Sequence, residues 1–288
     1  MIGDLAADYY LILPQRQKGD EKRTATRSLR LPGGTGANAA VTAAVLGSQV
    51  ALYSVVGTDQ LGAWLKAGVA ARGVSTSGVR VVPGDTTQAT VLLEPRDRQV
   101  IVDRGVADRL DEVNPEQIGH ADVVYVTGSS AAIARVAAAG ARSLLVAGTE
   151  AGMAGDADLA TQLENVDLLI TNSAGWATFG RYAATVTAVE TQGPRGAVIH
   201  APSSPDQHIP GIAVDAVDAT GAGDCLAGAL CHYLAAGLDV PAACRLAVVA
   251  AGLSTLGVGA QGALPSDAEV RAAAARAAVS TARSGGAR

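Results

Sequence analysis

Residues 218–224, with the sequence Asp-Ala-Thr-Gly-Ala-Gly-Asp, form the strongest candidate for chemistry in this chain. The apolar residues that follow recur at helical spacing, so we expect a helix to begin near Gly221. A helix start exposes backbone N–H groups, and the small residues Gly221, Ala222 and Gly223 would let an anion approach them. Asp224 then lies in the first turn, where its carboxylate would repel a phosphate unless it accepts a proton from an attacking hydroxyl. The stretch indicates an anion-binding turn beside a general base, although an ordinary capped helix start has a similar composition.

A second glycine-rich turn lies early in the chain, at residues 32–38, and opens an amphipathic helix that ends near Gly47. Gly33 and Gly34 allow positive φ and close approach of the backbone, and Asn38 offers both a donor and an acceptor. The turn lacks the Lys-Ser/Thr pair of a Walker A loop, and it does not match a GxGxxG turn followed by an acidic residue. A P-loop enzyme and a Rossmann dinucleotide-binding protein are therefore disfavoured. A plain glycine-rich turn before a helix remains the alternative.

Polar residues also follow several predicted strands. Asp8 lies near the predicted carboxyl end of a first strand and Asn172 at the end of a later one, and ligands gather at such ends in open α/β sheets. The turn at residues 191–196 offers hydroxyl and backbone N–H groups to a nucleotide phosphate. Arg104, where a predicted hairpin returns to the main domain, could bind a phosphate or a substrate oxygen. Each of these positions is also compatible with an ordinary loop or turn.

The composition excludes several classes of protein. Acidic residues exceed basic ones by 27 − 22 = 5, and no Lys/Arg cluster is interleaved with aromatics, so we expect no nucleic-acid partner. The first residues do not resemble a signal peptide, and the longest apolar stretch is too short to span a bilayer, so we expect a cytoplasmic protein without a membrane partner. The three cysteines lack CxxC spacing, so they are interpreted as reduced core residues.

The elements that must position these residues alternate between strand and helix. This alternation predicts an α/β fold with a doubly wound, mostly parallel sheet flanked by helices. The strands are expected at 50–56, 122–126, 143–146 and 166–170, and the helices at 59–72, 131–139, 156–163, 221–236, 240–256 and 266–278.

A small β-sheet lid is expected beside this sheet. The segment near residues 9–30 is too polar for a central strand. The β-rich segments at 79–82, 88–93 and 99–102 could pair with it, and residues 94–98 read as a hairpin turn between the last two. We therefore predict an α/β domain of residues 1–10, 32–78 and 105–288 and a lid of residues 11–31 and 79–104. The apolar lid strands favour a homodimer through the lid.

The two glycine-rich turns, Gly33-Gly34-x-x-x-Asn38 and residues 218–224, together resemble the paired signatures of the ribokinase-like (PfkB) carbohydrate kinase family. The resemblance covers nearly the whole chain. It implies ATP-dependent phosphorylation of a hydroxymethyl group of a sugar or sugar-like substrate, with ATP and Mg²⁺ required. Asp224 would be the general base, with its basicity lowered by the helix start, and the backbone of residues 221–223 would hold the transferring phosphoryl group.

The resemblance also assigns the remaining site residues. Substrate-binding positions are Asp8, Gly33, Gly34, Asn38 and Arg104; nucleotide-binding positions are Asn172, Thr191, Gly193 and Gly196; and a monovalent cation such as K⁺ would be held by Asp218 and Thr220, near the turn at Gly259.

One departure from the family pattern concerns the metal. Relatives usually carry a Glu that helps to order Mg²⁺ through water, where this chain has Gly175.

Two alternatives to a sugar kinase stay open. One is a nucleoside kinase of the same fold, although the lid supplies only Tyr9, Tyr10 and aliphatic residues to stack on a base. The other is a catalytically idle sugar-binding regulatory protein, which the loss of that Glu would suit.

Overall fold

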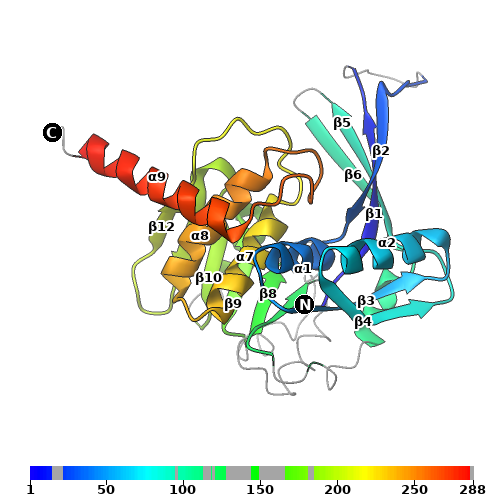
Figure 1. The fold of residues 1–288 in the computed structure, drawn as a ribbon, viewed down its shortest axis with the longest axis horizontal. Coiled ribbons are helices and arrows are strands. Elements are labelled where there is room, and N and C mark those ends of the chain that lie inside the picture. Colours follow the sequence, from blue (N-terminus) through cyan, green and yellow to red (C-terminus); the bar gives the residue numbers. More distant parts are fainter. Residues whose placement is uncertain are drawn as a thin grey trace.

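The computed structural model describes residues 1–14, 22–94, 97–112, 118, 121–127, 144–148, 166–180 and 185–285. The helices expected at 131–139 and 156–163 lie outside the described residues. Figure 1 shows a larger body of strands and helices, and a smaller sheet of β1, β2, β5 and β6 that projects from it.

The main sheet consists of two groups of strands joined by one residue near the N-terminus. Its order is β12-β11-β10-β9-β8-β7 in one group and β3-β4 in the other, and Ile2 forms parallel bridges to Tyr53 of β3 and Val126 of β7. The pairs from β7 to β10 and the pair β3/β4 are parallel, whereas β11 and β12 are antiparallel. The strands are β3 (Val50–Gly57), β4 (Val74–Val82), β7 (Val124–Thr127), β8 (Leu144–Gly148), β9 (Leu168–Asn172), β10 (Thr187–Thr191), β11 (Gly196–His200) and β12 (Gln207–Pro210).

Helices cover both faces of this sheet, which confirms the predicted α/β class. Buried side chains of α1, α2, α7 and α8 pack on one face, and Trp176 of α6 packs with Val106 and Leu110 on the other. The helix expected at 59–72 is present as α2, and Asp59 caps its start by accepting a hydrogen bond from the Gly62 amide at 2.8 Å. The helices are α1 (Thr35–Val45), α2 (Gln60–Ala71), α6 (Ser173–Phe179), α7 (Ala222–Ala235), α8 (Val240–Ser254) and α9 (Asp267–Gly285).

The smaller sheet, called the lid below, has the strand order β2-β1-β5-β6. β1 pairs antiparallel with β2 and parallel with β5, and β5 and β6 form the predicted hairpin, in which Glu94 pairs with Asp97. The turn residues 95–96 are outside the described part of the chain. The lid strands are β1 (Ala6–Ile12), β2 (Arg27–Gly33), β5 (Gln88–Glu94) and β6 (Asp97–Asp103).

The strand pairing differs from the expectation at two places. Asp8 does not follow a strand of the main sheet, because only Ile2 joins that sheet and Asp8 is inside β1 of the lid. Residues 79–82 do not pair within the lid, because they end β4, which pairs with β3. Alternation of apolar residues identifies a strand but not its partner, since pairing is decided by contacts distant in sequence.

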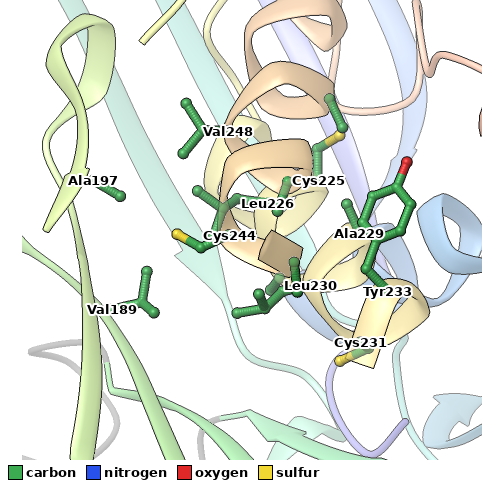
Figure 2. Packing of buried hydrophobic residues seen from close by; sticks show 14 of the residues in the cluster. Val189, Ala197, Cys225, Leu226, Ala229, Leu230, Cys231, Tyr233, Cys244 and Val248 are labelled. Atoms are coloured by element: carbon green, nitrogen blue, oxygen red, sulfur yellow. The ribbon is translucent and has the colours of Figure 1, made fainter. Parts of the chain in front are cut away.

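The core is built mainly from Ala, Val and Leu side chains, in a chain that has only one Phe, two Trp and six Tyr. Figure 2 shows side chains of α7 and α8, among them Leu226, Leu230 and Cys244, beside Val189 and Ala197 of the sheet. The three cysteines, at 225, 231 and 244, are free and buried, and burial raises the pKa of each thiol to about 12. They pack as small apolar groups with little thiolate character. Among the described residues, no helix combines the length and the apolar character needed to cross a membrane.

The crossing of α1 and α7 requires a residue without a side chain. A Cβ atom at Gly228 of α7 would lie 2.3 Å from the Ala39 backbone oxygen of α1 and 2.8 Å from the Thr42 Cβ. The contact between the two helices therefore depends on the missing side chain.

We expect Gly228→Ala to lower the free energy of unfolding by about 1 to 3 kcal/mol, because the new methyl group forces α1 and α7 apart. Gly68→Ala in α2 is the matched control, since a Cβ there meets no atom within 4 Å. The control should stabilise the protein by about 0.5 to 1 kcal/mol. Urea denaturation measures both values, and equal effects of the two substitutions would contradict the close helix contact.

Candidate active site

The two glycine-rich turns meet in the folded chain. Asn38 of α1 donates a hydrogen bond from Nδ2 to Oδ2 of Asp224 in α7, at 2.8 Å, although the residues are 186 positions apart in sequence. Asn38 is 4% exposed, so the contact lies in the interior between the two helices. The Asn38 amide in the first turn of α1 and the Asp224 carboxylate in the first turn of α7 are therefore in direct contact.

The early turn needs its glycines because the chain folds tightly over the N-terminal segment. Gly34 has φ +95°, and a Cβ there would lie 2.5 Å from the Asp4 backbone oxygen. The same oxygen accepts a hydrogen bond from the Ala37 amide at 3.0 Å. A Cβ at Gly33 would lie 2.3 Å from an Asp8 carboxylate oxygen, so the Asp8 side chain rests on the glycine backbone. Gly33, Gly34 and Asp8 thus form one compact group.

Arg104 lies near this group without joining it. Its Nε donates to the Asp108 carboxylate at 2.6 Å, and its side chain is 61% exposed. Burial raises the pKa of Asp4, and the nearby Arg104 charge partly opposes that rise. The structure therefore places Arg104 on the exposed surface, near enough to Asp4 for its charge to act on that carboxyl group.

The Asp224 carboxyl group is poised to gain and lose a proton near neutral pH. Its pKa is raised to about 7, and burial is the largest cause. The hydrogen bond from Asn38 opposes the rise, and the negative charge of Asp8 adds to it. The helix start was expected to lower the basicity of Asp224, but the net effect of its surroundings is to raise the pKa of this group. Loss of hydration disfavours the charged form more strongly than the local hydrogen bond favours it.

The late turn leaves the start of α7 open. Gly221 adopts a left-handed conformation with φ +74°, and no side chain caps the helix. A Cβ at Gly221 would lie 2.3 Å from the Ala260 Cβ, whereas a Cβ at Gly223 would meet no atom within 4 Å. The uncapped first turn and the free space at Gly223 provide the geometry that an anion needs at a helix N-terminus.

A cavity of about 470 Å³ begins at this turn. Thr191, Gly193 and Gly196, the residues expected to touch ATP, line it together with Ala222 and Gly223. The cavity continues between the turn after β10 and the apolar residues of α8, among them Val248, Ala251 and Gly252. One space therefore connects the predicted nucleotide residues with the predicted anion-binding turn.

Asn172 lies beside this space in a structural role. It pairs with Thr191 across β9 and β10, and its Oδ1 accepts a hydrogen bond from the Gly175 amide at 2.7 Å, which caps α6. Gly175, where the resemblance to the family implies a Glu, thus supplies a backbone donor.

Asp218 and Thr220 close a second loop. Asp218 Oδ1 accepts from both the Thr220 amide and the Thr220 hydroxyl, and Oδ2 accepts from the Gly259 amide at 2.9 Å. In the described part of the chain, no three His, Cys, Asp or Glu side chains converge to hold a metal ion. A cation role for this pair stays a prediction.

Sequence reasoning missed two residues around the site. Gln261 donates from Nε2 to Asn38 Oδ1 at 3.0 Å, and nothing in its spacing distinguishes it from an ordinary turn residue. Glu190 is buried in β10, where burial raises its pKa but hydrogen bonds from Ser173 and His200 lower it more. A charged residue inside an apolar strand was the available signal for Glu190.

Comparison with known proteins agrees with this geometry. The pfkB family carbohydrate kinase profile matches residues 1–267. The chain is 29% identical over 286 residues to a ribokinase of Bacillus subtilis, covering 94% of this chain and 97% of that protein. It is 32% identical over 254 residues to an ATP-dependent ribose-1-phosphate kinase of Halopiger xanaduensis, covering 82% and 84% of the two chains. The fold superposes with a TM-score of 0.86 on a nucleoside kinase of Burkholderia thailandensis in complex with inosine, at 21% identity and 96% coverage of both chains.

The matched profile spans both glycine-rich turns, the lid and the residues that line the cavity. The chain belongs to the pfkB family of carbohydrate kinases.

Proposed function

We propose that this kinase transfers the γ-phosphoryl group of ATP to a hydroxymethyl group of a sugar or sugar-like substrate. The observation that carries the proposal is the hydrogen bond between Asn38 and Asp224, the residue that follows Gly223 in α7; Gly223 lines the cavity together with Thr191. This contact brings the predicted acceptor-binding turn to the predicted donor-binding turn. The names of the ribokinase and of the ATP-dependent ribose-1-phosphate kinase support the substrate class and the donor.

In this mechanism, Asp224 accepts the proton of the substrate hydroxyl as its oxygen bonds to the γ-phosphorus. The bond between that phosphorus and the bridging oxygen of ADP breaks in the same transfer. The backbone of Gly221, Ala222 and Gly223 holds the transferring group, and Asp8 and Asn38 hold substrate hydroxyls. Positioning and charge neutralisation then provide most of the rate enhancement.

Mg²⁺ would enter this site with the phosphates of ATP. Asn172 already accepts the Gly175 amide, so the described residues around the cavity leave few oxygen ligands for a metal. Mg²⁺ commonly keeps several waters and binds through substrate phosphates, which suits such a site. The ion supplies charge neutralisation for the triphosphate. Asp218 and Thr220 remain the residues proposed for a monovalent cation such as K⁺.

The lid favours a sugar over a nucleoside. Tyr9 and Asp8 are consecutive in β1, so their side chains point to opposite faces of the lid, and the Arg30 guanidinium lies 5.9 Å from the Tyr9 ring centroid. Tyr10 is fully buried. Neither ring is placed to stack on a base beside Asp8.

A substrate panel tests the proposed function. We expect ATP-dependent release of ADP with at least one pentose, ketohexose, keto-deoxy acid or sugar 1-phosphate, and a much lower kcat/KM with nucleosides. Faster turnover of a nucleoside would favour the nucleoside kinase. Tight binding of one sugar without ADP release would favour a regulatory protein.

The pH dependence tests Asp224 as the base. Because its pKa is about 7, kcat/KM should rise with pH through a midpoint near 7 and then level off. Asp224→Asn should lower kcat by about 10²- to 10⁴-fold. Steady-state assays from about pH 5 to about pH 9 measure both effects.

Asp167→Asn is the matched control for this prediction. Asp167 is exposed and precedes the first residue of β9, whereas Asn172 is the last residue of that strand. The control should keep the wild-type profile. Full activity of Asp224→Asn, or a wild-type midpoint near the ordinary Asp value of about 4, would exclude Asp224 as the base.

We also propose a homodimer formed through the lid, in the cytoplasm. Val100, Ile101 and Val102 of the lid edge strand β6 are 46%, 60% and 55% exposed, and an apolar edge strand is a ready pairing surface. The three free, buried cysteines suit a reducing compartment.

Ile101→Lys should convert the dimer to a monomer in sedimentation velocity runs, because it places a charge on the apolar edge. Ala70→Lys on the exposed side of α2 is the control and should remain dimeric. A wild-type protein that sediments only as a monomer at micromolar concentration would retire this proposal.

A further inference from the structure

Gln261 extends the contact between the acceptor-binding turn and the base by one more residue. Its Nε2 donates to Asn38 Oδ1 at 3.0 Å, and Asn38 Nδ2 donates to Asp224 Oδ2 at 2.8 Å. The two amides and the carboxylate therefore form a directed chain of hydrogen bonds that ends on the base.

The direction of this chain matters because an asparagine amide can occupy its site in two orientations. With its NH₂ group toward Asp224, Asn38 stabilises the ionised carboxylate; rotated by half a turn, it would present its carbonyl oxygen to the same carboxylate. A donor on the far side of Asn38 favours the first orientation. Gln261 is placed to be that donor.

The loop that carries Gln261 is held at three points. The Asp218 carboxylate accepts from the Gly259 amide, and Ala260 packs against Gly221 at the start of α7. Gly259 has φ +80°, and a Cβ there would lie 2.5 Å from Leu31 Cδ1 in lid strand β2. The backbone at Gln261 is thereby fixed relative to α7, the lid and Asn38.

The other groups around Asp224 do not replace the Asn38 donor. Asp8 from β1 is anionic and raises the pKa of Asp224. The charge of Asp224 acts in turn on Tyr125 of β7 and on Cys225 of α7, and burial raises the pKa of both, that of Cys225 to about 12. Both of these groups are therefore neutral where the kinase would work. Within the part of the chain that the structure describes, the hydrogen bond from Asn38 is the side-chain interaction that lowers the pKa of Asp224.

We propose that Gln261 is a positioning residue that holds the Asn38 amide with its NH₂ group toward Asp224 and so keeps the carboxylate supplied with a donor. The consequence for catalysis rests on the proposed role of Asp224 as the general base. The geometric part of the inference does not depend on that role.

The test uses Gln261→Met, which keeps side-chain length but removes the amide, and Gln261→Glu, which replaces the donor with an acceptor. The Asp224 carboxyl is titrated directly by NMR on protein with ¹³C-labelled aspartate, and its signal is assigned by its loss in Asp224→Asn. We expect the titration midpoint to rise by about half a pH unit or more in Gln261→Met and further in Gln261→Glu. The midpoint of kcat/KM against pH should rise with it, while activity above the midpoint approaches that of the wild type.

Two controls isolate the route of the effect. Gln207→Met, on the exposed strand β12, should leave the Asp224 midpoint unchanged. In an Asn38→Ala background, Gln261→Met should add no further shift, because residues that act through one another are not additive.

An unchanged Asp224 midpoint in both Gln261 variants would overturn the proposal. So would an equal loss of activity at every pH, which indicates a structural role alone. If the wild-type protein phosphorylates no acceptor, the proposed function fails, but the NMR titration still decides the role of Gln261. If Gln261→Met does not fold, Gln261→Leu, which also removes the amide without adding a charge, decides it.

Discussion

The close crossing of α1 and α7 is the constraint on which the candidate site depends. Gly228 lets the two helices approach until only backbone and small side chains separate them. That approach sets Asn38 within hydrogen-bond distance of Asp224. A chain with few aromatic residues and many Ala and Gly residues suits such crossings, because small side chains let helix axes lie close together. Composition, packing and the site geometry are linked through this one contact.

Desolvation then changes the chemistry of the groups that the crossing brings together. Asp224 is surrounded by protein on most sides, and Asp8 adds a second carboxylate nearby. The result is a carboxyl group with a pKa of about 7, close to the value that suits proton exchange in neutral solution. The Asn38 amide, a neutral donor, moderates this shift. A basic residue in the same place would stabilise the carboxylate too strongly for it to act as a base.

At the predicted nucleotide side of the site, Gly175 stands where the resemblance to the family implies a Glu. Gly175 offers only its amide, which Asn172 uses to cap α6. Glu190 lies on the neighbouring strand, but its oxygens are engaged by Ser173 and His200.

Local features were determined by the sequence alone. Asp59 and Gly221 mark helix starts because capping and left-handed backbone depend on one or two neighbouring residues. Paired glycine-rich turns also sufficed to indicate the family and the candidate residues. Only the tertiary structure decided that β1 belongs to the lid, that Gln261 reaches Asn38, and that the pKa of Asp224 rises. Strand pairing, hydrogen bonds across 200 or more positions and desolvation all depend on groups distant in sequence, which no local pattern specifies.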